Sequence, residues 1–157
     1  MRSRLVSLAA LAVLGAAAGC VDTTRCHTAV DWKPCAGETA EPGASGTPPQ
    51  IVELSLPTCA SVDAPTVSGT LHVTDADGDA QVLKVTLTSG GMRSDETELE
   101  LDDAGRSGND WSGSFSLMVT GSMGGMVMQG SDDVRVKVTD RAGGQSLPLC
   151  NTIAIVQ

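Results

Sequence analysis

Three acidic residues that lie close together in the chain are the first candidates for a binding site. Asp75, Asp77 and Asp79 alternate with small residues, so their carboxylates could turn toward one point. Calcium takes six to eight oxygen ligands, which closely spaced carboxylates can supply. The spacing does not fit an EF-hand, because Gly78 is fourth and Thr86 twelfth when Asp75 is counted as first. Asp and Gly also favour turns. The sequence therefore predicts a turn here, with a calcium site as the alternative.

A Gly-rich stretch between residues 118 and 130 holds Met118, Met123, Met126 and Met128. Clustered thioethers suit Cu(I), a soft metal ion. Methionine also fills irregular gaps against a core, which a loop between two strands would require. Copper is therefore a minor alternative to calcium, and no cofactor is required by the sequence.

Residues for catalysis are scarce. A hydrolase triad needs a His near a nucleophile and an orienting acid, and the only histidines are His27 and His72. No Gly-x-Ser-x-Gly motif surrounds any serine. Glu96, Glu98 and Glu100 alternate along one face of a predicted strand, as on a solvated edge. We predict that the chain has no catalytic residues and is not an enzyme, with His72 as the base if it is one.

The first 19 residues predict a signal peptide for export. Arg2 and Arg4 precede an apolar run over 5–18, which is shorter than the roughly 20 residues that span a bilayer. The stretch Ala17-Ala18-Gly19-Cys20 resembles the lipobox of bacterial lipoproteins, with Ala17 in place of the usual Leu. The resemblance implies that Cys20 becomes the first mature residue and carries acyl chains such as palmitate, which bind it to a membrane. Val21, which is not acidic, implies the outer membrane.

Five cysteines are an odd number for an exported chain. Lipidation of Cys20 would leave Cys26, Cys35, Cys59 and Cys150, which can form two disulfides in an oxidising compartment. Three pairings are possible, and closeness in the sequence favours Cys26–Cys35. The ligand count and spacing of Cys26, His27 and Cys35 do not fit a structural zinc site.

Composition divides the mature chain into two parts. Residues 36–50 contain three Gly and three Pro, which is typical of a linker. We predict a lipid-anchored, disordered stalk over 20–50 and one domain over 51–157.

In 51–157 apolar residues alternate with polar ones, which indicates half-buried strands. Seven strands are predicted, at 51–56, 67–74, 82–88, 96–102, 111–119, 134–138 and 149–156. The residues expected to face inward are Val52, Leu54, Leu56, Val67, Leu71, Val73, Leu83, Val85, Leu87, Leu99, Leu101, Trp111, Phe115, Leu117, Val119, Val134, Val136, Val138, Ile153 and Ile155. Seven short strands without a helical period predict an all-β antiparallel sandwich.

Two connections carry a resemblance to a known fold. Residues 74–79, Thr-Asp-Ala-Asp-Gly-Asp, are similar to the junction between the second and third strands of bacterial immunoglobulin-like, cadherin-like or PKD-like domains. Residues 134–144 resemble the last hairpin of such domains, where a strand enters an Asp-x-Ala-Gly turn. In these sandwiches the first and last strands run side by side, so the resemblance implies a Cys59–Cys150 disulfide.

Charge limits the possible partners. Removal of Arg2 and Arg4 with the signal peptide leaves eight basic and 19 acidic residues, a net charge of −11. Phosphate backbones repel such a surface, so no nucleic acid partner is expected. With no Tyr, one Phe and two Trp, the chain also lacks the aromatic faces of a sugar-binding platform. The sequence predicts a membrane-tethered structural or protein-binding module of the cell envelope, without a small-molecule substrate.

Overall fold

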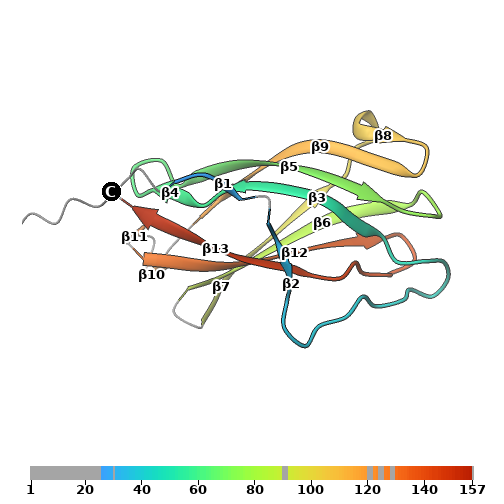
Figure 1. The fold of residues 1–157 in the computed structure, drawn as a ribbon, viewed down its shortest axis with the longest axis horizontal. Coiled ribbons are helices and arrows are strands. Elements are labelled where there is room, and N and C mark those ends of the chain that lie inside the picture. The colour runs from blue at the N-terminus through green and yellow to red at the C-terminus, as the bar shows by residue number, and fades with distance from the viewer. Residues whose placement is uncertain are drawn as a thin grey trace, which may run out of the picture.

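The fold consists of two antiparallel β-sheets that face each other, with a separate small hairpin (Figure 1). The structure is a computed structural model, and it describes residues 26–29, 31–89, 92–119, 122–123, 126–127 and 130–156. These residues contain no α-helix, and one 3-10 turn, η2, covers Asp103–Gly105. None of their helices is long and apolar enough to cross a membrane.

The first sheet has five strands in the order β1-β3-β5-β9-β8. Their bounds are β1 Thr28–Ala29, β3 Gln50–Pro57, β5 Thr66–Thr74, β9 Asp110–Met118 and β8 Arg106–Ser107. The second sheet follows the order β2-β13-β12-β6-β7, and β4 pairs in parallel with β13. Its strands are β2 Lys33–Pro34, β13 Leu149–Val156, β12 Gly130–Asp140, β6 Ala80–Ser89, β7 Met92–Glu100 and β4 Cys59–Ser61. The hairpin pairs β10 Ser122–Met123 with β11 Met126–Val127.

This strand order is that of the immunoglobulin fold. Strands β3-β5-β9-β8 correspond to A-B-E-D, and β13-β12-β6-β7 to G-F-C with one added C′ strand. The predicted immunoglobulin-like β-sandwich is therefore confirmed. The seven predicted strands are β3, β5, β6, β7, β9, β12 and β13, and short strands raise the two sheets to five and six strands.

Alternate residues of the long strands fill the space between the sheets. All the residues expected to face inward are buried or packed against the core except Val52, which is 58% exposed. The pairing of β3 with β5 shifts between Ile51 and Glu53, so a bulge reverses the alternation at this point. Ile51 then packs against the core in place of Val52.

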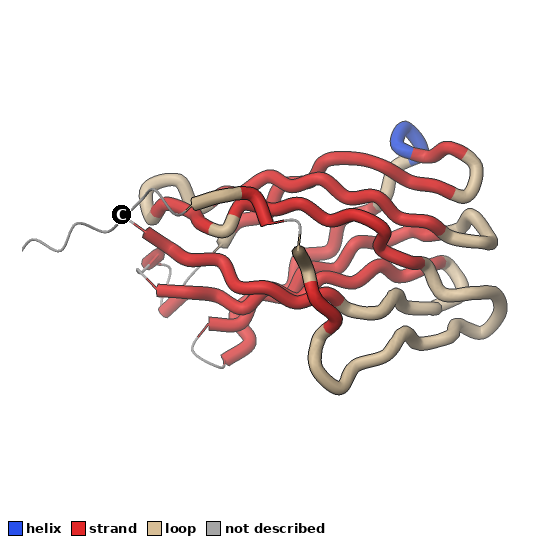
Figure 2. The backbone as a smooth tube through the Cα atoms, in the orientation of Figure 1, coloured by secondary structure: helices blue, strands red, loops and turns tan. Residues whose placement is uncertain are grey.

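The stalk predicted over 20–50 is wrong for residues 26–29 and 31–50, which pack on the sandwich. β1 pairs with the end of β3, and β2 pairs with the start of β13, so this segment crosses from one sheet to the other. Figure 2 shows the long loop between β2 and β3. Within this loop the N–H of Glu41 donates to the carbonyl of Gln145 (2.9 Å), and Arg135 of β12 binds the carboxylate of Glu38. The domain therefore includes residues from Cys26 onward.

The four cysteines form two disulfides, but the expected pairing is wrong. Cys26 is bonded to Cys59, and Cys35 to Cys150. The expected Cys59–Cys150 bond fails because β4 places Cys59 opposite Ala154, four residues beyond Cys150. Cys35 lies directly after β2, whose Lys33 is opposite Cys150, so the two Cα atoms are 5.1 Å apart.

Candidate functional site

The acidic turn of residues 75–79 connects β5 to β6, as the sequence predicted. The buried carboxylate of Asp75 accepts hydrogen bonds from the N–H groups of Asp77 (3.2 Å) and Asp79 (3.0 Å). The N–H of Gly78 donates to the carbonyl of Asp75 (3.0 Å), and Gly78 has a φ of +70°, which glycine adopts without strain. The carboxylate of Asp77 accepts the N–H of Thr47 (2.7 Å). These contacts support the turn interpretation.

Asp79 is the residue of this turn whose ionised form is destabilised by its surroundings. Its pKa is raised, first by desolvation, then by a hydrogen bond with Asp75 and by the charges of Asp75, Asp140 and Asp77. Asp140 reaches this site from the end of β12, where its Oδ1 accepts the N–H of Gly144 (2.7 Å). In the part of the chain that the structure describes, no three His, Cys, Asp or Glu side chains converge to hold a metal ion. Calcium at Asp75, Asp77 and Asp79 remains a prediction from the sequence.

Replacing Asp79 with Asn should stabilise the fold at neutral pH. A carboxyl whose pKa is raised in the folded protein loses stability as pH rises from its ordinary pKa, about 4, through its raised value. The unmodified chain bears this cost at pH 7, and the cost disappears below the ordinary pKa of the carboxyl. We expect Asp79→Asn to raise the melting temperature by about 2 °C at pH 7 and to leave it unchanged at pH 3.5.

Asp63→Asn is the matched control, since Asp63 is exposed in the turn after β4 and its substitution should change neither melting temperature. A lower melting temperature for Asp79→Asn at pH 7 would show that the ionised carboxylate has a stabilising partner.

A second site is a shallow hollow on the outer face of the first sheet. It has a volume of about 400 Å³ and is lined by Glu53, Thr70, Leu71, His72, Ser112 and Gly113. The strand register creates it, because Glu53 of β3, His72 of β5 and Ser112 of β9 lie directly opposite one another. Asp110 borders the hollow, with its Oδ1 3.6 Å from Nε2 of His72.

The arrangement at His72 is a solvent-exposed pair of an imidazole and a carboxylate. The side chains of His72 and Asp110 are 36% and 54% exposed, so their attraction is worth at most about 1 kcal/mol when His72 is protonated. A serine nucleophile needs a hydrogen bond to its base at about 2.6–3.2 Å. The structure describes both His72 and Ser112, and no hydrogen bond joins their side chains in the described part of the chain. The hollow offers hydrogen-bonding groups to a ligand rather than an activated nucleophile.

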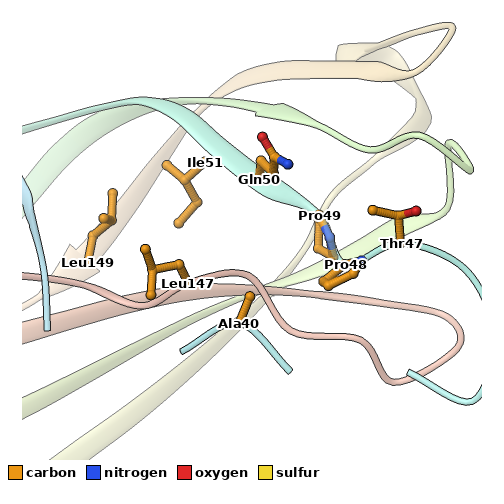
Figure 3. Close-up of a pocket in the computed structure, with 8 residues that line it drawn as sticks. All are labelled: Ala40, Thr47, Pro48, Pro49, Gln50, Ile51, Leu147 and Leu149. Atoms are coloured by element: carbon orange, nitrogen blue, oxygen red, sulfur yellow. The ribbon is translucent and has the colours of Figure 1, made fainter. Parts of the chain in front are cut away.

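A third site is an apolar groove on the side of the sandwich, where the loop before β3 approaches the segment before β13 (Figure 3). Its volume is about 330 Å³, and its lining residues are Ala40, Thr47, Pro48, Pro49, Gln50, Ile51, Leu147 and Leu149. Figure 3 shows Ile51, Leu147 and Leu149 around one space. The groove exists because residues 40–50, predicted as a linker, form one of its walls.

The methionines of the copper hypothesis can be placed only in part. Met118 ends β9 with 58% of its surface exposed. Met123 and Met126 are opposite each other in the hairpin of β10 and β11. Met128 lies outside the described residues, as do Cys20 and the signal peptide over 1–19.

Comparison with known proteins indicates the fold and no more. No protein-family model and no curated protein matches the chain. The C-terminal domain of wzt is a similar solved structure, with a TM-score of 0.52 and 11% identity over 79% of this chain and 81% of that chain. The PKD domain of an M14-like peptidase from Thermoplasmatales archaeon SCGC AB-540-F20 has a TM-score of 0.45 and 19% identity. That match covers 72% of this chain and 100% of the other.

Glu53, Asp110 and Ser112 were not singled out in the sequence. The strand containing Ser112 was predicted, and His72 lies between Leu71 and Val73, which were expected to face inward. The missing information was the register between strands, which places these residues in one row.

Proposed function

We propose that the chain is a membrane-tethered, non-enzymatic lipoprotein that displays an immunoglobulin-like protein-binding module in the cell envelope. The fold is that of a structural or binding domain. The observation that supports the tether is the cysteine pairing. The two disulfides use four of the five cysteines, so Cys20 has no cysteine left with which to pair. Acylation accounts for this remaining thiol, and more than one acyl chain holds a protein firmly on a membrane.

The Cys26–Cys59 disulfide makes the proposed tether short. Only five residues lie between Cys20 and Cys26, so a lipid on Cys20 would lie within about 20 Å of this disulfide. Cys59 is at the end of the sandwich that carries β4, β1 and the C-terminal end of β13 (Figure 1). The opposite end carries the acidic turn of residues 75–79 and the exposed Asp103 and Asp110. The acidic end would thus be presented away from the membrane, where anionic lipids would repel it least.

The tether is tested by comparing the full precursor with Cys20→Ala in the bacterial host. We expect the unchanged protein to enter the detergent phase in Triton partitioning, with an N-terminal peptide that begins at acylated Cys20. Cys20→Ala should stay in the aqueous phase with an unmodified mass. Equal partitioning of both proteins, with an unmodified Cys20, would contradict the proposal.

The non-enzymatic part is tested separately. Reproducible turnover of a substrate by the mature chain, abolished in His72→Ala, would contradict it. The contact with a partner protein is the remaining part of the proposal, and the edge of β9 is the surface that best fits it.

A further inference from the structure

Strand β9 has an open edge. β5 pairs with β9 along its whole length, whereas β8 covers only Asp110 and Trp111 on the other side. Gly105 lies against Ser112 on the same side. Among the described strands, none pairs with this side of residues 113–118, and Figure 1 shows β9 as the outermost long strand of its sheet. A strand without a neighbour exposes a row of N–H and C=O groups that can pair with another chain.

The direction of these N–H groups follows from the register. Val119 donates its N–H to the carbonyl of Pro65 (2.7 Å), on the side of β5. In an antiparallel pair, alternate residues direct their N–H groups to the same side. The even-numbered residues of β9 therefore face this edge. Because Arg106 is opposite Trp111, Gly105 lies opposite Ser112 and covers it, so the open N–H groups are those of Ser114, Ser116 and Met118.

This edge lacks the usual protection against pairing. Natural sheet edges carry charges, proline or short strands that prevent aggregation. β7, at the edge of the other sheet, has Glu96, Glu98 and Glu100. Residues 112–118 of β9, Ser-Gly-Ser-Phe-Ser-Leu-Met, contain no charge and no proline. The contrast between the two edges indicates that β9 is left available for pairing.

We propose that the edge of β9 binds an extended segment of a partner protein as an added strand. The inference rests on the proposed protein-binding function and names its surface. The exposed Asp103 and Asp110 lie at the start of the edge, and Asp102 accepts the indole N–H of Trp111 there through its carbonyl (2.8 Å). A basic residue beside Asp110 would therefore strengthen binding. A second copy of this chain is a poorer partner, because each mature chain has a net charge of −11.

The sequence of β5 provides a rational probe. Thr66 of β5 is opposite Met118, and Leu71 is opposite Gly113. A peptide with residues 66–71 followed by two lysines would, when antiparallel to β9, pair with the open residues 113–118 and place its lysines at the end of the edge where Asp103 and Asp110 lie. The probe is this peptide. Its control has proline in place of Ser68, which is opposite Ser116 and would otherwise donate its N–H to β9.

Hydrogen exchange of the mature chain in detergent micelles tests the proposal. With the probe peptide in excess, the edge amides of Ser114, Ser116 and Met118 should exchange at least tenfold more slowly. The proline peptide should leave their exchange unchanged. Unchanged exchange with the probe, or equal protection by both peptides, would overturn the proposal. Protection that appears without peptide and grows with protein concentration would also overturn it, because the partner would then be a second copy.

A variant of the edge itself gives the matched comparison. Ser114→Pro removes one N–H that faces the open edge and leaves the hydrogen bonds to β5 intact, whereas Ser114→Ala keeps that N–H. We expect at least tenfold weaker binding of the probe for Ser114→Pro and unchanged binding for Ser114→Ala. Equal binding by both variants would contradict the inference. The lipid on Cys20 plays no part in this measurement, so its result is independent of the partitioning test.

Discussion

Replacing both Cys35 and Cys150 with alanine should lower the free energy of unfolding by about 5 kcal/mol. The disulfide closes a loop with a sequence separation of 115, and the entropy that it removes from the unfolded chain grows with loop length. A loss of this size is a large part of the stability of a typical domain, about 5–15 kcal/mol. Urea unfolding followed by tryptophan fluorescence would measure it.

The matched control removes the other disulfide. Cys26→Ala with Cys59→Ala opens a loop with a separation of 33, for which the same model gives a loss of about 4 kcal/mol. Replacing both partners in each variant avoids a free thiol that could form a new bond. A loss below about 1 kcal/mol for the Cys35 and Cys150 variant would show that the chain-entropy argument does not hold for this fold.

Replacing Asp132 with valine should raise the free energy of unfolding by about 2 kcal/mol. Asp132 lies on the inner side of β12, in line with Val134, Val136 and Val138, and it is fully buried. Among the residues that the structure describes, neither of its carboxylate oxygens has a hydrogen-bond partner. A buried polar group without a partner costs about 1–3 kcal/mol, and more if it is charged. Valine extends the apolar row and removes this cost.

Asp133→Val is the control for this substitution. Asp133 is the exposed neighbour on the opposite face of β12, and it accepts a hydrogen bond from the hydroxyl of Thr152 (3.0 Å). Its replacement should change the free energy of unfolding by less than about 0.5 kcal/mol. If Asp132→Val instead destabilises the fold by more than 1 kcal/mol, Asp132 has a stabilising role that outweighs its burial.

The strands were predictable because their cause is local. Leu83, Val85 and Leu87 alternate with polar residues in β6, and all three are buried. The prediction that Val52 faces inward was wrong because a bulge inserts one residue relative to the partner strand. The local sequence pattern does not contain the pairing with that partner. Alternation therefore determines which residues face inward only where the pairing is regular.

The packing of residues 31–50 could not be predicted from composition. The Gly- and Pro-rich stretch has few apolar side chains, but its position depends on backbone hydrogen bonds, such as that of Ala44 N–H to the carbonyl of Ala142 (2.9 Å). Gly43 also lies against residues 142–144, where a side chain would collide with the backbone. Such contacts require small residues such as glycine. In a sequence, a stretch rich in glycine is equally typical of a flexible linker.

Some of the sites could be predicted from the local sequence, and others depend on how the strands pair. The turn at Asp75 was predictable, because Asp and Gly specify it locally. The disulfide pairing and the row of Glu53, His72 and Ser112 depend on strand register, which a single sequence does not give. The open edge of β9 follows from β8 being only two residues long.

If the chain is exported as we propose, its disulfide topology also constrains how the protein matures. A chain that crosses the membrane from its N-terminus brings Cys26 and Cys35 into the oxidising compartment together, long before Cys150 follows. The pair that meets first is therefore not a native pair, since Cys35 must wait for a residue in the last strand. Native bonding then requires either that these thiols stay reduced until export is complete or that an early bond is rearranged by thiol–disulfide exchange. Maturation of this small domain would thus depend on the disulfide-exchange enzymes of its compartment.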